Sequence, residues 1–289
     1  MTDLHTIADA LAWARQALAR TYVAEPLDGP VLLAHVLGCD RAALLAHPER
    51  PLTPDQETAF RALIARRTEG VPVAYLTGRR AFFDLELLVT PDVLIPRPET
   101  EGLVELALTW ARERSGRLRL IDVGTGSGAI ALALARHLPG AQVWAVDLSF
   151  AALRVARANA ARHGLSERVH FLQVDLLTAC GGPFPPFDLI AANLPYIPAD
   201  TLPDLPVSRH EPLLALDGGP DGLALIRRLL ADTPRVLAPG GLLLLEIEAT
   251  QGEQVTALAA QAFPGATIQV HQDYAGLPRV LSVERKGLT

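Results

Sequence analysis

Cysteine is scarce in this chain of 289 residues, and its scarcity excludes two classes of protein. The two cysteines, Cys39 and Cys180, lie far apart, and neither has a histidine or cysteine at the spacing of metal ligands. A secreted scaffold held by disulfide bonds is therefore excluded, and so is a zinc site, so we expect no bound metal. Both cysteines are expected to be small, buried, apolar residues.

Long hydrophobic runs are also lacking. No apolar stretch approaches the roughly 20 residues that are needed to cross a bilayer. The first ten residues, MTDLHTIADA, do not have the basic and then apolar pattern of a secretory signal. The sequence therefore predicts a cytoplasmic protein that does not contact a membrane.

An excess of positive charge is missing as well. The formal net charge at pH 7 is −6, because 32 Asp and Glu residues face 26 Lys and Arg residues. A protein that held nucleic acid through unspecific phosphate contacts would need the opposite balance. We therefore expect a protein or a small molecule as the partner, and no stable binding of nucleic acid.

Short apolar runs, in contrast, are plentiful: hydrophobic residues make up 49% of the chain, which predicts a well-buried core. In residues 1–78 the runs follow a helical period. A first helix is expected from residue 4 onward, a second begins near Pro30 and ends near Gly38, and a third follows Thr53 as its N-cap. These features predict a small N-terminal helical bundle.

Residues 79–97 have a different pattern, in which apolar side chains alternate with others from Phe83 to Val89. Such alternation is typical of a strand or a hairpin. We interpret this segment as a connector between two domains.

Residues 98–289 alternate between strand patterns and helix patterns. Strands separated by helices of 10 to 15 residues predict an α/β domain, with a doubly wound, mostly parallel sheet covered on both faces. The last two strands are joined by the short segment DYAGL, so they are expected to form an antiparallel hairpin within the sheet. The seven expected strands are LRLIDV, AQVWAV, VHFLQV, LIAA (residues 189–192), GGLLLLEIE, ATIQVHQ and PRVLSVE.

A glycine-rich turn follows the first of these strands. Gly124, Gly126 and Gly128, with Thr125 and Ser127 between them, stand after a strand and before a helix. Glycines there let the backbone approach a ligand, and the next helix presents free N–H groups. A dinucleotide fingerprint has its third glycine one position later, where this chain has an alanine that the fingerprint tolerates. A nicotinamide site therefore stays open at this point.

Carboxylates end the next two strands. Asp147 lies about 20 residues after the glycine turn, where it can accept hydrogen bonds from both hydroxyls of a ribose. Asp175, with Leu176 beside it, is placed to meet an adenine amino group. The alternative is that Asp147 caps the next helix and Asp175 is a surface turn residue. A nucleoside ligand accounts better for the glycines and both carboxylates together.

The fourth strand ends in an unusual tetrapeptide, Asn193, Leu194, Pro195 and Tyr196. Pro195 forces Leu194 into an extended conformation, so the Leu194 carbonyl points outward. The Asn193 side chain adds an acceptor and a donor, and Tyr196 adds a flat apolar wall. This set suits a planar –NH2 group, although Asn-x-Pro also occurs in plain turns.

Several motifs together resemble one family. The chain is similar to the release-factor glutamine methyltransferases of the HemK/PrmC type, from about Arg66 to its C-terminus. The motifs are RRTEGVPVAYLTG, VLIPRPETE, DVGTGSGAIALALA, ANLPYI, EPLLALDGGPDGL, LEIE and DYAGLPRV.

The resemblance implies a class I methyltransferase fold and S-adenosylmethionine as the methyl donor. The acceptor it implies is the glutamine side-chain nitrogen in the Gly-Gly-Gln loop of peptide chain release factors. The N-terminal bundle would then dock the release factor or merely stabilise the larger domain. The catalytic candidates are Asn193, Leu194, Pro195 and Tyr196, and the cofactor candidates are Gly124, Thr125, Gly126, Ser127, Gly128, Asp147, Asp175, Leu176 and Asn193.

Two departures from the family pattern are visible. Leu194 stands where the family has a proline, and Phe83–Asp84 replaces a usual glycine in the connector, where Ala81 also replaces an acidic residue. The segments IPRPETE and RHEPLLALDGGPDG, with Glu211, fit either the edge of the site or ordinary structural turns.

Three other functions compete with this one. In adenine-N6 or other nucleic-acid amino methylation, Asn193 to Tyr196 would hold an exocyclic amine in the same way. The acidic charge balance disfavours this function. A nicotinamide dehydrogenase leaves Asn193 to Tyr196 unexplained. A binding module without catalysis would use the helical bundle and keep the sheet as a scaffold.

Overall fold

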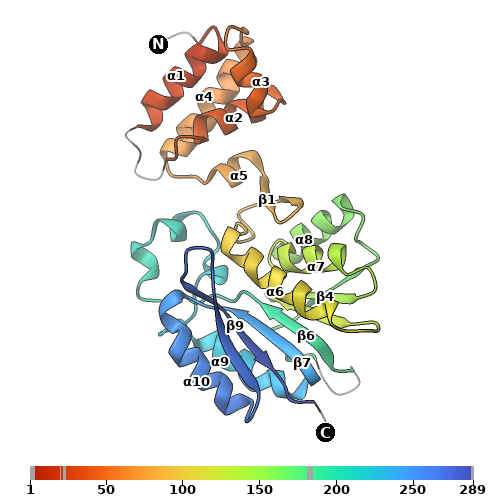
Figure 1. Ribbon diagram of the computed structural model, residues 1–289. Helices are drawn as coiled ribbons and strands as arrows, with labels where there is room; N and C mark the ends of the chain where they lie inside the picture. The colour runs from red at the N-terminus through yellow and green to blue at the C-terminus, as the bar shows by residue number, and fades with distance from the viewer. Residues whose placement is uncertain (1–3, 20, 22–23, 181–184, 288–289) are drawn as a thin grey trace. The chain divides into compact units, whose positions relative to one another are not determined.

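The computed structural model describes residues 4–19, 21, 24–180 and 185–287, so the outer ends of the predicted domains, residues 1 and 289, lie outside the described residues. The chain divides into two compact units, Met1–Arg79 and Arg80–Thr289 (Figure 1). Within the described ranges, each helix is too short or too polar to span a bilayer.

The first unit consists of helices whose ends are capped by their own sequence. Thr53 accepts a hydrogen bond from Gln56 N at 3.2 Å and forms a capping box, and Gly38 ends a helix with a left-handed φ of 63°. Both residues act as the sequence predicts. The helices are α1 (Ile7–Leu18), α2 (Asp28–Leu37), α3 (Arg41–Ala46), α4 (Pro54–Thr68) and α5 (Val73–Thr77).

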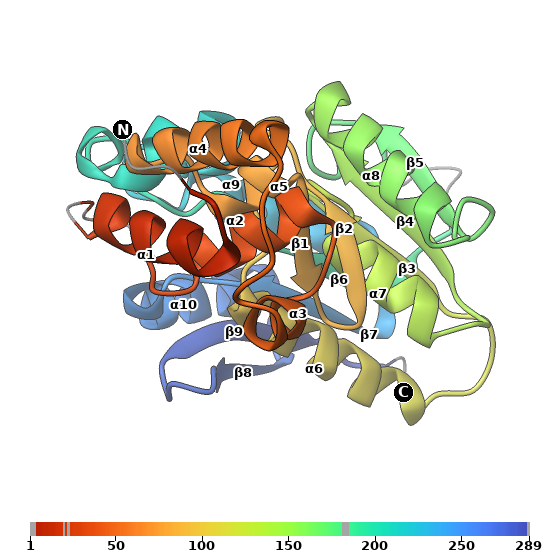
Figure 2. The same ribbon diagram turned by 90° about the horizontal axis from the view of Figure 1, so that it is seen from above.

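Helices α1, α2 and α4 pack against one another (Figure 2). The side chains that they bury are aliphatic and aromatic, as the helical period predicts. The largest fully buried side chains of this core are Leu4, Ile7, Leu32, Leu33, Leu44, Phe60 and Ile64. A buried ion pair between Arg67 and Asp28, at 2.7 Å, ties α4 to α2.

The connector forms a two-stranded sheet from β1 (Arg79–Phe82) and β2 (Leu85–Leu88). Its turn places Phe83 at a φ of 54°, a left-handed conformation that favours glycine. Asp84 accepts from Arg136 Nε at 2.7 Å and lies 3.1 Å from His137 Nε2. These contacts anchor the turn, although the residue at its tip is not the glycine that the turn favours.

The second unit is centred on a seven-stranded sheet with the order β5-β4-β3-β6-β7-β9-β8. The first five strands in this order are parallel, and β9 is antiparallel to both β7 and β8. This confirms the predicted fold class. The strands are β3 (Arg119–Val123), β4 (Gln142–Asp147), β5 (Val169–Gln173), β6 (Phe187–Ala192), β7 (Leu237–Glu246), β8 (Thr267–Gln272) and β9 (Pro278–Glu284).

Helices cover both faces of the sheet (Figure 1). Successive residues of β3 show this arrangement, because Leu120 packs with one set of helices and Ile121 with the other. The first set is α6 (Glu101–Arg112), α7 (Ala129–His137) and α8 (Phe150–Arg162), and the second is α9 (Ala224–Asp232) and α10 (Gly252–Ala262). The strand order reverses between β4 and β6, on either side of β3, which creates a crevice at the carboxyl ends of these strands.

Helix α9 is shorter than the predicted helix over residues 221–237. Pro234 lacks the N–H that an α-helix needs, and residues Thr233–Arg235 form a 3-10 turn instead. At the other end, residues 218–222 are held in a turn that packs against the backbone of Tyr196, so the helix begins only at Ala224.

Candidate active site

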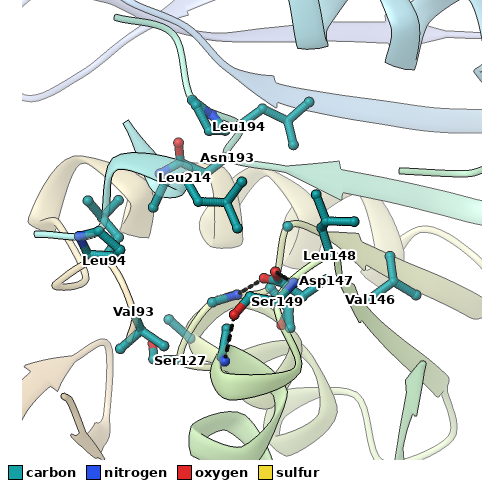
Figure 3. A pocket seen from close by; sticks show the side chains of 18 of the residues that line it. Val93, Leu94, Ser127, Val146, Asp147, Leu148, Ser149, Asn193, Leu194 and Leu214 are labelled. Carbon is teal, nitrogen blue, oxygen red and sulfur yellow. Dashed lines mark hydrogen bonds between the residues drawn. The ribbon is translucent and has the colours of Figure 1, made fainter. Parts of the chain in front are cut away.

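A cavity lies at the crevice where the strand order reverses. Its walls come from the ends of β3, β4, β5 and β6 and from two loops that precede α6 and α9. Figure 3 shows Asn193 and Leu194 across this cavity from Asp147 and Ser149. Ten of the residues predicted for the site line it: Gly124, Thr125, Gly126, Ser127, Asp147, Asp175, Leu176, Asn193, Leu194 and Pro195.

The glycine turn has a different requirement at each glycine. All three have positive φ, at 77°, 55° and 86° for Gly124, Gly126 and Gly128. A Cβ on Gly124 would approach Leu194 Cδ2 to 3.1 Å, and one on Gly128 would approach Ala156 Cβ to 3.2 Å. A Cβ on Gly126 would meet no atom of the described residues within 4 Å. Gly126 is therefore the glycine whose backbone is open to a ligand.

Asp122, which is not among the residues predicted for the site, supports this turn. Its Oδ2 accepts from Thr125 Oγ1 at 2.6 Å and from Ala131 N at 3.1 Å, which joins the turn to the start of α7. Burial raises its pKa to about 7. Oδ1 is buried without a hydrogen-bond partner among the described residues. An acidic residue in an otherwise apolar strand was the available signal.

Asp147 is held by two backbone groups. Its Oδ2 accepts from Gly126 N at 2.9 Å and its Oδ1 from Ser149 N at 2.8 Å (Figure 3). Ser149, and not Asp147, caps α8 by accepting from Ala152 N. Burial raises the pKa of Asp147. Each carboxylate oxygen has a second lone pair, so both can still accept from a ligand.

Asp175 and Leu176 form the far wall of the cavity. Asp175 is partly exposed and pairs with Arg228 at 2.7 Å, an arrangement compatible with either a ligand contact or a surface turn. Leu176 is buried and has a φ of 50°, a conformation that costs free energy for a branched side chain. Strain of this kind is concentrated near functional sites.

At the opposite wall, Asn193 is the first of a chain of three polar side chains. Asn193 Nδ2 donates to Thr100 Oγ1 at 3.1 Å, and Thr100 Oγ1 donates to Glu246 Oε2 at 2.6 Å. Thr100 ends the 3-10 turn Pro98–Thr100, and Glu246 ends β7. Thr100 directly precedes α6, where a threonine often caps the helix, but its side chain does not cap this one.

Tyr196 and Gly128, which the sequence also assigns to the site, are not among the residues that line the cavity. Burial, and next the charge of Glu246, raise the pKa of Tyr196 to about 12, so its hydroxyl stays protonated. The Tyr196 carbonyl accepts from Gln251 Nε2 at 3.1 Å. The backbone of the tetrapeptide is therefore fixed to the start of α10.

The loop LDGGPDGL presses against this same backbone, so it is more than a plain turn. Gly218 N donates to Ile197 O at 2.8 Å. A Cβ on Gly218 would lie 2.8 Å from Tyr196 Cα, and one on Gly222 would lie 2.2 Å from Tyr196 O. The glycines are needed because two backbone segments meet without space for a side chain.

Replacing Gly222 with alanine should lower the free energy of unfolding by about 3 kcal/mol, because the new Cβ overlaps a backbone oxygen in a left-handed residue. Gly240→Ala is a matched control. Gly240 has the same φ of 74°, and its Cβ would meet no described atom within 4 Å, so about 1 kcal/mol is expected. Urea unfolding of both variants measures the difference, and equal losses would contradict the clash.

Glu211 has a structural task at the edge of the cavity. Its Oε2 accepts from Ile95 N at 3.0 Å and its Oε1 from Arg97 at 2.5 Å, and the carboxylate is buried. It ties the loop before α9 to the segment IPRPETE, of which Pro96, Arg97 and Thr100 line the cavity. Both segments that the sequence left open therefore border the site.

Comparison with known proteins decides the family. Residues 9–78 match the family model "PrmC N-terminal domain" and residues 120–205 match "Methyltransferase domain". A release factor glutamine methyltransferase of Gloeobacter violaceus is 44% identical over 93% of this chain and 94% of its own length. One from Moorella thermoacetica is 45% identical over 97% and 99%. The chain belongs to the release factor glutamine methyltransferase family.

This membership confirms the resemblance seen in the motifs. The matches to these two relatives extend over nearly the whole length of this chain and of each relative, so both units are included. The N-terminal domain of human METTL16, solved in complex with SAH, has the same fold with a TM-score of 0.50 and 18% identity; the likeness covers 70% of this chain and 76% of that one. In the described part of the glutamine methyltransferase chain, no group of three or more His, Cys, Asp or Glu residues is arranged to hold a metal ion.

Proposed function

We propose that this protein transfers a methyl group from S-adenosylmethionine to the side-chain amide nitrogen of the glutamine in the Gly-Gly-Gln loop of peptide chain release factors. One observation carries the proposal: a single cavity is lined by a ribose-type acceptor, Asp147, and by an amide grip, Asn193. These residues stand at the ends of β4 and β6, the two strands that flank β3. The named relatives support the choice of substrate.

The donor side fits S-adenosylmethionine, which when bound supplies a methyl group on a positively charged sulfur. Gly126 leaves room for the ligand beside the backbone, and Asp147 keeps lone pairs for two ribose hydroxyls. Leu148 and Leu176 add apolar surface for an adenine ring. The SAH-bound neighbour has the same fold, which agrees with this assignment.

The acceptor side fits a primary amide. The Asn193 side-chain oxygen and the Leu194 carbonyl are two acceptors for the two hydrogens of the glutamine –NH2. Pro195 keeps Leu194 extended, so the carbonyl stays available although leucine replaces the family's proline. The Leu194 side chain is buried against the glycine turn, which fixes this residue by packing instead of by a ring.

The grip provides catalysis by position. An amide nitrogen is a poor nucleophile, and a side chain cannot deprotonate it beforehand near neutral pH. Holding both hydrogens on acceptors raises the electron density on nitrogen and aims its lone pair at the methyl group. As the new N–C bond forms, the S–C bond of the methyl donor breaks, and the nitrogen then releases one of its hydrogens as a proton to water. We also assign the helical unit, which matches the PrmC N-terminal domain, to docking the body of the release factor.

A methyl-transfer assay with a tritiated donor tests the function. The purified chain is incubated with release factor, with a release factor whose Gly-Gly-Gln glutamine is replaced by alanine, with DNA and with RNA. Label is expected on the intact release factor alone. Label on DNA or RNA would favour the amino methyltransferase of nucleic acids instead, and label on the substituted release factor would contradict the assigned glutamine.

A further inference from the structure

Asn193 can grip an amide only if its own amide is turned the right way round. Its oxygen must face the substrate, because a glutamine –NH2 offers hydrogens and accepts none well. An asparagine side chain rotated by half a turn would present its own –NH2 and would repel the substrate. Some feature of the protein must therefore select one of two nearly isosteric orientations.

Thr100 makes this selection through the single hydrogen of its hydroxyl. That hydrogen goes to Glu246 Oε2 at 2.6 Å, the length of a hydrogen bond to an ionised carboxylate. With its hydrogen committed, Thr100 Oγ1 can only accept from Asn193, so the Asn193 –NH2 faces Thr100 at 3.1 Å. The Asn193 oxygen is then directed to the opposite side.

We propose that Glu246 and Thr100 are positioning residues: the negative charge of Glu246, passed on by the Thr100 hydroxyl, holds the Asn193 amide with its oxygen toward the substrate. This inference rests on the proposed function, because it concerns how the grip of that reaction is set. Thr100 and Glu246 are only 4% and 1% exposed, so water does not compete for these hydrogen bonds.

Protonation of Glu246 reverses the direction of the hydrogen bonds that link Glu246, Thr100 and Asn193. A neutral carboxyl can donate to Thr100, whose hydrogen then turns to Asn193 and selects the orientation that presents –NH2 to the substrate. Burial, and to a smaller extent the charge of Glu99, raises the pKa of Glu246 to about 7, and the hydrogen bond from Thr100, the charge of Arg279 and a weaker direct hydrogen bond from Asn193 oppose this rise. The groups that face Glu246 are Thr100 and Glu99 from the 3-10 turn, Asn193 and Tyr196 from the loop after β6, and Arg279 from β9.

The sign of the pH dependence follows from this. Above about pH 7 Glu246 is ionised and the grip is set; below it, the fraction of correctly oriented Asn193 falls. The kcat/KM for release factor should therefore fall about tenfold for each unit of pH on the acid side. The affinity for the methyl donor should not follow this curve, because Glu246 is not among the cavity-lining residues.

The experiment compares wild type, Glu246→Gln, Thr100→Val and Thr100→Ser from pH 6 to 9. Thr100→Val should lower kcat by about 30-fold, since the Asn193 amide loses its hydrogen bond to Thr100 and keeps only the weaker interaction with Glu246, while Thr100→Ser should recover it to within about threefold. Glu246→Gln should lower kcat at pH 8 and remove the acid limb. Thr233→Val deletes another buried threonine hydroxyl, which donates to Leu229 O away from the cavity, and controls for loss of stability.

The outcomes separate the two hypotheses. A wild-type chain that labels no release factor would refute the proposed function itself. An active wild type with an acid limb that persists in Glu246→Gln would overturn the positioning role and would point to another buried acid, such as Asp122. Equal kcat values for Thr100→Val and Thr100→Ser would also overturn it, provided that calorimetry shows unchanged binding of S-adenosylmethionine.

Discussion

Replacing Asn193 with alanine is expected to lower kcat for methyl transfer by at least about 10³-fold, while S-adenosylmethionine binds within about threefold of its wild-type affinity. The substitution removes one of two acceptors that hold the substrate amide, and groups aimed at a reacting centre in a dry site contribute on this scale. Asn193 lies across the cavity from Asp147, so the donor side keeps its contacts (Figure 3). Single-turnover kinetics and calorimetry measure the two quantities.

The other asparagine of the chain, Asn159, provides a control in which stability and not catalysis should change. Asn159 is fully buried and bonds to Leu88 N, Leu88 O and Ser127 O at 2.7 to 3.0 Å. Asn159→Ala should lower the free energy of unfolding by about 3 kcal/mol because it leaves backbone groups unsatisfied. Asn193→Ala should instead unfold like wild type. An Asn193→Ala enzyme that retains activity within about threefold would contradict the proposed grip.

Replacing Asp147 with alanine should weaken the binding of the methyl donor and affect kcat much less. We expect the Kd for S-adenosylmethionine to rise by about 10²-fold, because two charge-assisted hydrogen bonds to ribose hydroxyls are lost. The change also releases Gly126 N and Ser149 N, which loosens the turn under the ligand. At saturating donor, kcat should fall much less than in Asn193→Ala.

Asp188 is a suitable control for this variant. Its Oδ2 also accepts from a backbone group, Arg119 N at 2.7 Å, but at the start of β3 and β6 and not at their carboxyl ends. Asp188→Ala should reduce stability and leave the Kd unchanged. If both variants bound the donor with equal affinity by calorimetry, the ribose assignment of Asp147 would be wrong.

Much of the site could be predicted from the sequence because its signals are local. Asn193 and Pro195 directly follow a strand pattern, and Gly124 and Asp147 each follow a strand in the same way. In a parallel sheet, the carboxyl ends of neighbouring strands meet at one edge. Knowing the strands was therefore enough to bring these residues to one cavity.

The supporting residues could not be predicted in this way. Thr100 lies 93 positions from Asn193 and 146 from Glu246, and nothing in either local pattern links them. Thr100 precedes a helix, where a threonine is ordinarily a cap, and Glu246 follows an apolar run as an ordinary strand-ending acid. The clash at Gly222 likewise depends on a backbone segment from another part of the chain. Such roles come from tertiary packing.

The contact between Leu194 and Gly124 has a consequence for how variants of this enzyme will behave. The residue that we propose offers its carbonyl to the acceptor rests directly on the glycine turn at the donor side, and even a Cβ added at Gly124 would come within 3.1 Å of Leu194 Cδ2. A bulkier residue on either side must displace the other. A substitution at Leu194 or at Gly124 should therefore change the kinetic constants for both substrates, the methyl donor and the acceptor.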